Sequence, residues 1–321
     1  MSELGNYLQL QNEEWQETVQ RASIHNSWFL PEFSNSAAQN IATHFLQKDT
    51  LQNWAAHYHL DDNISPKNVG IVMAGNIPMV GFHDLLCVFI SGHRQTIKLS
   101  SKDEILMKHI IQKLYELDPD TSSVISIAEN LKGCDAYIAT GSNNTARYFE
   151  QYFGIYPNII RHNKTSVAVL TGDESEAELE ALSDDIHMYF GLGCRNVTKI
   201  YVPEAYDFIP LLASFNKYSH FADFNKYKNN LDFQLSLLLL NKKYYMTNGS
   251  TLLVENKLNF SAISVLNYAF YKKEEEIVIS HPEEIQCVVG KDFIPFGNAQ
   301  KPNLFNYADQ VDTLQFLLTI G

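Results

Sequence analysis

The sequence predicts an α/β protein with a doubly wound parallel sheet and a second α/β domain. From about residue 66 onwards, short apolar runs alternate with helix-like stretches, and this alternation favours parallel strands joined by helices. Polar or glycine-containing turns follow three of the predicted strands, at residues 74–78, 98–101 and 140–143. Ligands of doubly wound sheets bind at the carboxyl ends of the strands, so these turns are candidates for a binding site.

The composition is that of an ordinary globular protein with a sizeable core. Of the 321 residues, 45% are hydrophobic and 19% are charged, and the formal net charge is −13. Such an acidic balance argues against a nucleic-acid partner, which needs clustered Lys and Arg. The cysteines are Cys87, Cys134, Cys194 and Cys287, far apart and without metal-ligand spacing. We therefore expect reduced thiols and no metal site.

The ends and apolar runs of the chain bear on its location. The N-terminus has neither a basic segment nor an apolar segment of the secretory type. The longest apolar runs, at 85–90 and 235–240, are too short to span a bilayer. We expect a cytoplasmic protein without a membrane span.

In the first half of the chain, residues 1–60 are expected to be helical because apolar residues recur at helical spacing. Strands are predicted at 69–74, 96–99, 124–127 and 136–139, with helices at 82–91, from about 104, and at 145–153. Ser100 is available as the N-cap of the second of these helices. Residues 157–164 are interpreted as a crossing between domains.

The second half repeats the alternation with longer apolar segments. We predict strands at 166–170, 197–202, 244–254, 276–279 and within 282–289, and helical or buried segments at 174–189, 209–215 and 231–240. The apolar tail at 311–320 is expected to return to a sheet. The expected domains are 1–60 (a helical segment that packs on the cofactor domain), 61–157 (dinucleotide-binding), 158–285 (the catalytic domain, carrying Cys194) and 286–321 (a C-terminal return segment).

Cys194 stands on a glycine-framed turn, Gly191-Leu-Gly-Cys194, between a predicted helix and a predicted strand. A thiol in such a place is suited to be a nucleophile. Cysteine is also among the most buried residue types, so an inert packed thiol is the competing interpretation. Motifs elsewhere in the chain are needed to distinguish a nucleophilic thiol from an inert one.

Several short motifs occur in one order along residues 66–321. They are Gly75-Asn-Ile-Pro78, Lys98-Leu-Ser-Ser101, Thr140-Gly-Ser142, Gly191-Leu-Gly-Cys194 and Glu283-Glu-Ile285, followed by residues 296–300 and 306–314. Together they resemble the aldehyde dehydrogenase superfamily, and within it the acyl-CoA reductases of the LuxC type. The resemblance implies an aldehyde dehydrogenase-like fold with a cofactor domain and a catalytic domain.

The resemblance also implies roles for individual residues. Cys194 would be the nucleophile, and the Asn76 amide would stabilise the oxyanion that its attack produces. The remaining candidates would bind a nicotinamide cofactor: Lys98, Ser100 and Ser101 at the adenine ribose, Gly141 and Ser142 at the pyrophosphate, and Glu284 at the nicotinamide ribose. Taken alone, Asn76 is better explained as an ordinary turn residue, and residues 98–101 as a helix N-cap with a solvated lysine.

Two departures from the family pattern refine the expected chemistry. Ser101 stands where NAD-preferring members carry a glutamate, which favours NADPH and leaves NADH possible. Ile160 lies 34 residues before Cys194, where hydrolytic members keep their catalytic base. Without that base, transfer of the acyl group to water is disfavoured, and reduction of a thioester is favoured.

The resulting hypothesis is NADPH-dependent reduction of an acyl-CoA, or of an acyl-carrier thioester, to an aldehyde. A fatty acyl group is the expected substrate, bound as a covalent thioester on Cys194. One alternative is a cysteine-dependent acyltransferase or thioesterase without a redox step, and another is a non-catalytic protein on a dehydrogenase fold. The resemblance leaves a homodimer open.

Overall fold

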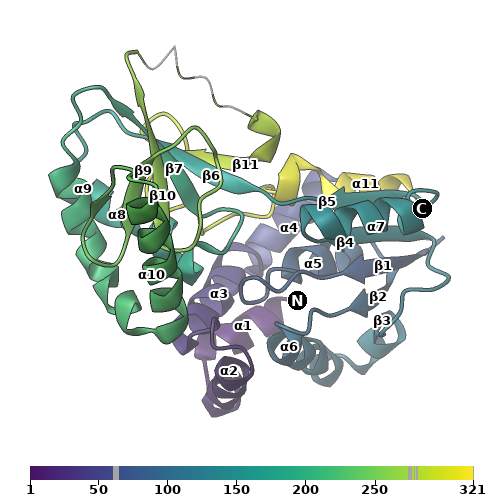
Figure 1. Ribbon diagram of the computed structural model, residues 1–321. Coiled ribbons are helices and arrows are strands. Elements are labelled where there is room, and N and C mark those ends of the chain that lie inside the picture. Colours follow the sequence, from purple (N-terminus) through teal and green to yellow (C-terminus); the bar gives the residue numbers. More distant parts are fainter. Residues whose placement is uncertain (61–64, 274–276, 278, 280, 321) are drawn as a thin grey trace. The chain divides into compact units, whose positions relative to one another are not determined.

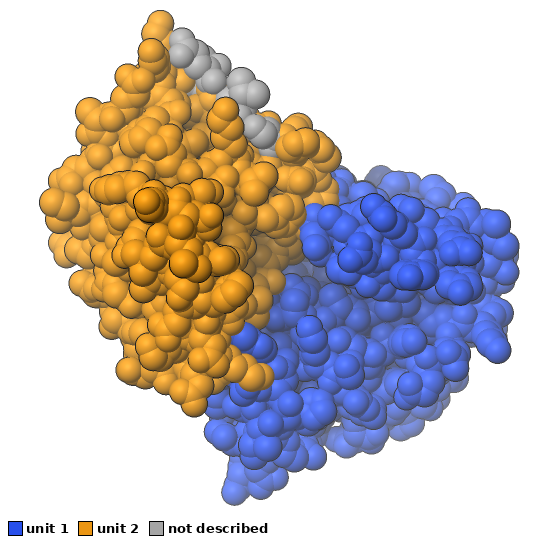
Figure 2. Space-filling view, viewed as in Figure 1, with its two compact units in different colours: residues 1–163, 302–321 blue, residues 164–301 orange. Residues whose placement is uncertain are grey.

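The computed structural model describes residues 1–60, 65–273, 277, 279 and 281–320 of the chain (Figure 1). The chain forms two compact units, which Figure 2 distinguishes by colour. Unit 1 comprises Met1–Asn163 and Pro302–Gly321, and unit 2 comprises Lys164–Lys301. The segment 286–321, expected as one return segment, is thus divided between the units.

Unit 1 is built around a five-stranded sheet in the order β3-β2-β1-β4-β5, with all neighbouring strands parallel. Its strands are β1 (Asn68–Val72), β2 (Arg94–Lys98), β3 (Ile125–Ile127), β4 (Ala136–Thr140) and β5 (Asn158–Arg161). The chain runs from β1 outward to β3 and then crosses to β4 and β5. The strand order therefore reverses beside β1, so the carboxyl ends of β1 and β4 flank the place where such sheets bind ligands.

The helices of unit 1 fall into two groups. Four precede the sheet: α1 (Ser2–Leu10), α2 (Glu13–His25), α3 (Pro31–His44) and α4 (Lys48–His57). The others, α5 (Phe82–Ile90), α6 (Glu104–Leu117), α7 (Asn143–Phe153) and the 3-10 turn η1 (Pro119–Ser123), alternate with the strands. The prediction of a helical N-terminal segment is confirmed. Its periodic apolar residues, such as Leu4, Leu8 and Trp15, are fully buried.

The C-terminal segment of unit 1 ends in a helix, α11 (Thr313–Thr319), so the predicted return to a sheet is wrong. Asp312 caps this helix by accepting the N–H of Gln315 at 2.8 Å. Leu314 and Leu317, three residues apart, are fully buried on one face of it. A capping aspartate followed by apolar residues at this spacing stabilises a helix over a strand.

Aromatic residues attach this segment to the N-terminal helices. A 3-10 turn, η6 (Ala308–Gln310), precedes α11, and Tyr307 lies just before it. The Tyr307 hydroxyl accepts a hydrogen bond from Trp54 Nε1 at 3.1 Å and lies 2.8 Å from the Tyr58 hydroxyl. Tyr58 in turn donates to Asp312 at 2.7 Å. Hydrogen bonds therefore join side chains at the end of α4 to the C-terminal segment, about 250 positions later in the sequence.

Residues 157–164, interpreted from sequence as a crossing between domains, contain the boundary between the two units, and they also contain the edge strand β5, which the sequence did not predict. Arg161, the last residue of β5, is buried and forms an ion pair with Asp84 of α5. It also donates to Thr313 Oγ1 of α11 at 2.8 Å. One buried guanidinium thus joins a strand and two helices, and that arrangement depends on both partners being in place.

Unit 2 contains a six-stranded sheet in the order β11-β6-β7-β10-β9-β8. Its strands are β6 (Thr165–Val169), β7 (Val197–Pro203), β8 (Met246–Thr247), β9 (Leu252–Glu255), β10 (Val265–Tyr271) and β11 (Ile285–Val289). All neighbours are parallel except β8 and β9. The helical elements are α8 (Glu176–His187), η2 (Met188–Gly191), α9 (Phe208–Ser214), η3 (Phe215–Asp223), α10 (Asn225–Leu240) and η5 (Pro282–Glu284).

Most predicted elements of unit 2 are present, with three differences. The segment 244–254 contains two short antiparallel strands, β8 and β9, rather than one strand. Sequence analysis did not identify β10. The strand predicted at 276–279 lies largely outside the described residues. The two sheets, each with helices, confirm the predicted α/β fold class.

Asp84→Ala tests the buried ion pair of unit 1. The substitution leaves the Arg161 guanidinium buried without its carboxylate, so the free energy of unfolding should fall by about 3–5 kcal/mol. Urea denaturation of both proteins measures this difference. Lys108→Ala is the control, because it breaks an exposed pair with Glu104 and should cost less than about 1 kcal/mol. Equal effects of the two substitutions would contradict the role given to Arg161.

Candidate active site

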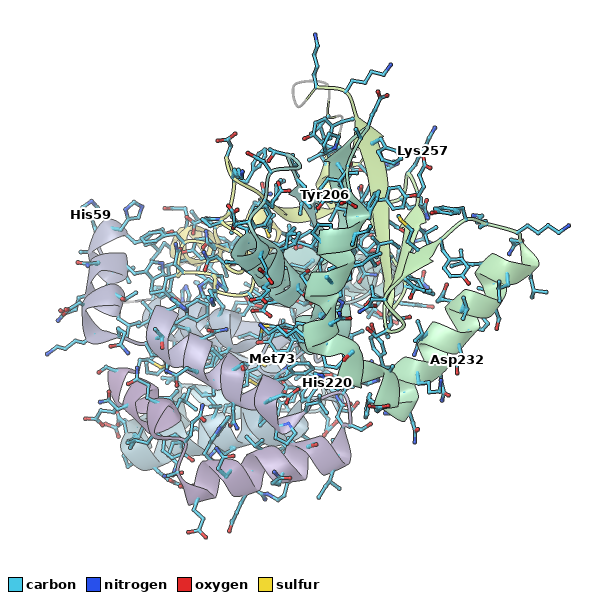
Figure 3. The ribbon with its side chains drawn as sticks, turned by 90° about the vertical axis from the view of Figure 1, so that its left-hand side faces the viewer. His59, Met73, Tyr206, His220, Asp232 and Lys257 are labelled. Atoms are coloured by element: carbon cyan, nitrogen blue, oxygen red, sulfur yellow. The ribbon has the colours of Figure 1, made fainter. Side chains whose placement is uncertain are left out.

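The loops that follow β1 and β2 in unit 1 are packed directly against each other. Met73, labelled in Figure 3, comes directly after β1, and its N–H donates to the carbonyl of Lys98 at 3.0 Å. A Cβ at Gly75 would lie 2.4 Å from Ser100 Oγ and 2.7 Å from Ser100 Cβ. Only glycine allows the backbone to approach Ser100 this closely. The turn that carries Asn76 therefore rests on the candidate ribose-binding loop.

The candidate side chains on these loops are accessible. Asn76, Lys98 and Ser101 are exposed, and Ser100 is partly exposed. Ser100 was predicted to cap the next helix, but α6 begins at Glu104 with Asp103 at the N-cap position. The carbonyl of Ser100 accepts the N–H of Asp103 at 3.0 Å, which turns the chain one step before the helix.

The third predicted turn connects β4 to α7. Ser142 is the N-cap of α7, and its hydroxyl accepts the N–H of Thr145 at 3.3 Å. Gly141 has no space for a side chain, because a Cβ there would lie 2.9 Å from the Phe149 ring. The N-terminal N–H groups of α7 thus open at the carboxyl edge of the sheet, beside a residue without a side chain. A helix N-terminus with close backbone access is suited to an anionic pyrophosphate.

The N-terminal helices reach the candidate ribose-binding loop. His25, the last residue of α2, donates from Nε2 to the carbonyl of Ser101 at 2.8 Å. The Asn26 amide donates to the carbonyl of Lys102 at 3.2 Å. Both acceptors are backbone atoms, so α2 fixes the course of the loop and leaves the side chains of Ser101 and Lys102 exposed.

In unit 2, Cys194 lies between η2 and β7 and is partly exposed. The chain reaches it through three successive residues with positive φ: Tyr189 (55°), Phe190 (56°) and Gly191 (74°). Such a conformation is costly for residues with a Cβ and persists only where the surroundings hold it. Phe190 is buried against the rings of Phe221 and Phe224, which supplies part of that restraint.

Asn196 holds both ends of this strained loop and is fully buried. Its Oδ1 accepts the N–H of Gly193 at 2.8 Å. Its Nδ2 donates to the carbonyl of Asp185 at 3.0 Å and to that of Met188 at 2.9 Å. One side chain thus satisfies the end of α8 and the residue before Cys194. An asparagine within a glycine-rich turn was the only sequence signal for this role.

A second contact fixes the backbone of Cys194 from the neighbouring strand. The Ser166 hydroxyl, on β6, donates to the carbonyl of Cys194 at 3.1 Å. The same hydroxyl lies 3.1 Å from Cys287 Sγ on β11. Burial raises the pKa of the Cys287 thiol. Of these two partly exposed thiols, Cys194 is the one on the glycine-framed loop.

Asp185 connects the same helix to the segment 296–300, a motif of the resemblance without an assigned role. Its carboxylate accepts the N–H of Gly297 at 2.6 Å and that of Ala299 at 3.0 Å. A Cβ at Gly297 would lie 3.0 Å from Ala181 Cβ, so this segment packs closely on α8. The motif therefore braces the helix that leads to Cys194.

Glu284 lies at the end of η5, directly before β11, and is partly exposed. Its carboxylate accepts a hydrogen bond from Asn259 Nδ2 at 3.0 Å. Lys164, directly before β6, donates from Nζ to the carbonyl of Glu283. Unit 2 therefore brings Lys164 and the predicted segment 283–285 together, because β11 pairs with β6.

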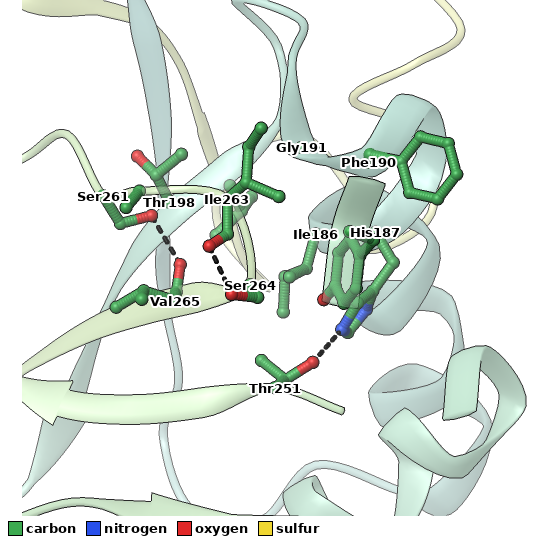
Figure 4. Close-up of a pocket in the computed structure, with 13 residues that line it drawn as sticks. Ile186, His187, Phe190, Gly191, Thr198, Thr251, Ser261, Ile263, Ser264 and Val265 are labelled. Atoms are coloured by element: carbon green, nitrogen blue, oxygen red, sulfur yellow. Dashed lines mark hydrogen bonds between the residues drawn. The ribbon is translucent and has the colours of Figure 1, made fainter. Parts of the chain in front are cut away.

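A cavity of about 30 Å³ lies in unit 2 beside Gly191 (Figure 4). His187 lines it, donating from Nδ1 to the Ser183 carbonyl at 2.8 Å and accepting from Thr251 Oγ1 at 2.9 Å. Burial lowers the pKa of His187 to about 4, so the ring is neutral at pH 7. The space accommodates about one water molecule and is too small for an acyl chain.

The predicted site residues fall into two groups. Unit 1 holds Asn76, Lys98, Ser100, Ser101, Gly141 and Ser142, and unit 2 holds Cys194 and Glu284. In the described part of the chain, no three His, Cys, Asp or Glu side chains are grouped so as to hold a metal ion. Nor does any helix there combine the length and apolarity needed to cross a bilayer.

Asn196→Ala tests the support of the Cys194 loop. The substitution leaves the Gly193 N–H and the carbonyls of Asp185 and Met188 without this partner, and each buried group left unpaired costs about 1–3 kcal/mol. We expect a lower free energy of unfolding and faster amide hydrogen exchange at residues 189–196. Asn256→Ala is the control, since Asn256 makes one similar bond, to the N–H of Leu258, at the surface. Unchanged amide hydrogen exchange at residues 189–196 in Asn196→Ala would show that the loop keeps its conformation without the Asn196 side chain.

Asp185→Asn tests a pH dependence. Burial raises the pKa of Asp185 to about 7, although the two N–H groups it binds oppose the shift. The folded state therefore binds this proton more tightly than the unfolded chain, in which the pKa is about 4. The stabilisation is complete below about pH 4 and is lost as the pH rises to about 7.

The measurement is the free energy of unfolding of wild type minus that of Asp185→Asn, followed with pH. It should fall between about pH 4 and 7, by up to about 1.4 kcal/mol per unit, and be constant above. His187 changes stability in the opposite direction below pH 6.5, and the subtraction removes its contribution. A difference that rises with pH would show that Asp185 is preferentially ionised in the fold.

Comparisons with known proteins agree with this architecture. A family model described as acyl-CoA reductase (LuxC) matches residues 24–210, which is more than half of the chain. No curated protein matches the sequence.

Similar solved structures are aldehyde dehydrogenases and related enzymes. A putative aldehyde dehydrogenase from Burkholderia cenocepacia shares 12% identity, with a TM-score of 0.65 over 93% of this chain and 74% of that one. Aldehyde dehydrogenase 21 from Physcomitrella patens shares 12%, with a TM-score of 0.65 over 90% and 72%. An NADP-dependent enzyme from E. coli shares 10%, with a TM-score of 0.63 over 89% and 71%. At these identities the likeness shows the fold, and the family match shows the membership. The chain belongs to the acyl-CoA reductase (LuxC) family of enzymes, on an aldehyde dehydrogenase-like fold.

Proposed function

We propose that this enzyme reduces a fatty acyl-CoA, or an acyl-carrier thioester, to the aldehyde with NADPH, through a thioester on Cys194. The observation that carries the proposal is the Cys194 loop. A partly exposed thiol stands on a strained turn whose backbone is fixed on both sides by Asn196 and Ser166. Strain held in this way by the surrounding structure is typical of functional sites.

In the proposed reaction the Cys194 thiolate attacks the thioester carbonyl, and the oxyanion is stabilised by the Asn76 amide and the Cys194 N–H. The intermediate collapses with loss of the carrier thiolate, which takes a proton, and the acyl group remains on Sγ. Bound NADPH supplies the hydride that reduces this acyl group. The resulting thiohemiacetal releases the aldehyde and restores the Cys194 thiolate.

The residues of unit 1 suit a dinucleotide. Gly75 and Gly141 have no room for a side chain, and the N-terminus of α7 faces the carboxyl edge of the sheet. Lys98 would contact the adenine ribose, Ser100 and Ser101 would line that end, and Gly141 and Ser142 would contact the pyrophosphate. Glu284 is the candidate for the nicotinamide ribose. Proteins of this fold include an NAD-dependent aldehyde dehydrogenase from Sinorhizobium meliloti and the NADP-dependent enzyme from E. coli, so the fold itself admits either cofactor.

The side chains around position 101 favour the phosphorylated cofactor. Ser101 carries no charge, and the exposed Lys102 lies beside it. A carboxylate at this position would repel a 2′-phosphate, and serine does not. Ile160, in β5, is apolar and cannot activate a water molecule, which favours reduction of the acyl-enzyme over its hydrolysis.

The test incubates the enzyme with acyl-CoAs of graded chain length and locates the acyl adduct by mass spectrometry. The adduct should form on Cys194, be absent in Cys194→Ala, and be discharged on addition of NADPH with production of aldehyde. Asn76→Ala should form it about 10²–10³ times more slowly. Cys287→Ala is the control and should still form it, because Cys287 is the other partly exposed thiol of unit 2.

The possible outcomes separate the alternatives. An adduct that passes to water or to another thiol without NADPH consumption would indicate a thioesterase or acyltransferase. No adduct with any thioester would indicate a non-catalytic protein.

The cofactor preference is tested separately. Ser101→Glu should weaken NADPH binding more than NADH binding, and Ser122→Glu, on the exposed turn η1, should change the binding of neither cofactor. Equal weakening of NADPH and NADH binding by Ser101→Glu would count against NADPH as the cofactor.

A further inference from the structure

Asp103 is a buried carboxyl group within the candidate site that the proposed reaction does not use. It is 3% exposed. It occupies the N-cap position of α6, yet its side chain makes no capping bond to that helix. Instead, Oδ2 accepts the N–H of Met79 at 2.7 Å. An N-cap aspartate ordinarily binds an N–H of its own helix, so this carboxyl serves another segment of the chain.

That segment is the turn of Asn76. Met79, three residues later, has a positive φ of 54°, which is unfavourable for a side chain of this size. Its N–H is bound by Asp103, and its carbonyl accepts the N–H of Phe82 at 3.0 Å. Hydrogen bonds to both its N–H and its carbonyl thus hold the Met79 conformation, and Asp103 is the partner that comes from outside this segment.

The other side of Asn76 is held by the same loop of unit 1. Gly75 packs against Ser100, where a Cβ would lie 2.4 Å from Ser100 Oγ. Asn76 therefore stands between two points, Gly75 and Met79, that are both fixed by residues 100–103. Loss of the Asp103 contact releases one of these points and leaves the other.

We propose that Asp103 is a positioning residue, which holds the turn 75–79 through the Met79 N–H so that the Asn76 amide meets the oxyanion in the correct orientation. This inference rests on the proposed function, because Asn76 acts only in the acylation of Cys194. Asp103 itself touches no reacting atom and acts only through the Asn76 turn.

The protonation state of Asp103 sharpens the test. Burial raises the pKa of this carboxyl well above its usual range, and Oδ1 has no hydrogen-bond partner among the described residues. The burial that raises this pKa disfavours the charged carboxylate, so an uncharged side chain of the same shape is a suitable replacement. Asparagine reproduces its shape and its acceptor, and alanine removes the acceptor. Asp103→Asn should retain most of the function that Asp103→Ala loses.

The experiment is a double-mutant cycle on the first chemical step. Acylation of Cys194 by an acyl-CoA is timed by mass spectrometry in the full-length enzyme without cofactor, in wild type, Asp103→Ala, Asn76→Ala and the double variant. Asp103→Ala should slow acylation about 10–100-fold, as expected when a catalytic group is displaced by about 1 Å. In the Asn76→Ala background it should cause no further slowing, because the group that it positions is gone.

Asp118→Ala is the matched control. Asp118 stands at the opposite end of the same helix and accepts a backbone N–H, that of Asp120, at 3.1 Å. Asp118 is exposed and is not one of the residues that hold the Asn76 turn. Cys194 of the Asp118→Ala variant should therefore be acylated at the wild-type rate. Thermal unfolding of every variant shows whether any loss of rate merely follows loss of folded protein.

Each outcome decides the inference. Acylation of Asp103→Ala at the wild-type rate, or equal slowing by Asp103→Ala with and without Asn76, would overturn it. If Asp103→Ala is unfolded at the assay temperature, all variants are assayed at a lower temperature at which it is folded. Asp103→Asn and Asp103→Ser, which keep an acceptor, should acylate faster than Asp103→Ala there. If wild type forms no adduct at all, the proposed function fails, and that result is distinct from failure of the cycle.

Discussion

The chemistry proposed for unit 2 depends on a single buried amide. Asn196 offers one acceptor and two donor hydrogens, and it uses them on the N–H of Gly193 and on carbonyls at the end of α8. A helix that ends in residues with positive φ leaves backbone groups without intrahelical partners. The asparagine satisfies them and fixes the Cys194 turn in the same step. The hydrogen bonds of Asn196, two residues after Cys194, thus offset the conformational free energy of the strained turn.

In unit 1, too, backbone segments beside the candidate site are fixed, but here the loops do this by packing on one another. Its binding edge consists of loops, and loops are ordinarily the mobile parts of an α/β unit. Here they support one another: Gly75 packs on Ser100, Met73 bonds to Lys98, and α2 fixes the carbonyls of Ser101 and Lys102. Rigid loops with exposed side chains are pre-organised for a ligand, because little conformational freedom remains to be lost on binding.

The sequence predicted the parts of this fold that depend on local patterns. Buried parallel strands give continuous apolar runs, so β1, β4, β6 and β7 were recognisable, as were the turns after β1 and β4. It failed where tertiary contacts decide. Residues 158–161 form an edge strand because β4 offers a pairing edge and Arg161 finds Asp84, and neither partner is visible locally. The apolar tail forms α11 because its leucines meet the core of unit 1. Asn196 and Asp103 were missed since their partners are backbone groups, which no sequence motif names.

The return of residues 302–321 to unit 1 has a consequence for how the protein folds as it is synthesised. Unit 2 is one continuous stretch of chain and can complete its core as soon as that stretch has left the ribosome. Unit 1 appears first but lacks Tyr307, Thr313 and the Leu317 carbonyl, which bind Trp54, Arg161 and His93. Until those residues emerge, Arg161 has Asp84 but lacks the Thr313 hydroxyl, and the indole of Trp54 lacks the Tyr307 hydroxyl. The older part of the nascent chain is therefore the last to be finished, and it is the part most exposed to chaperones and proteases in the meantime.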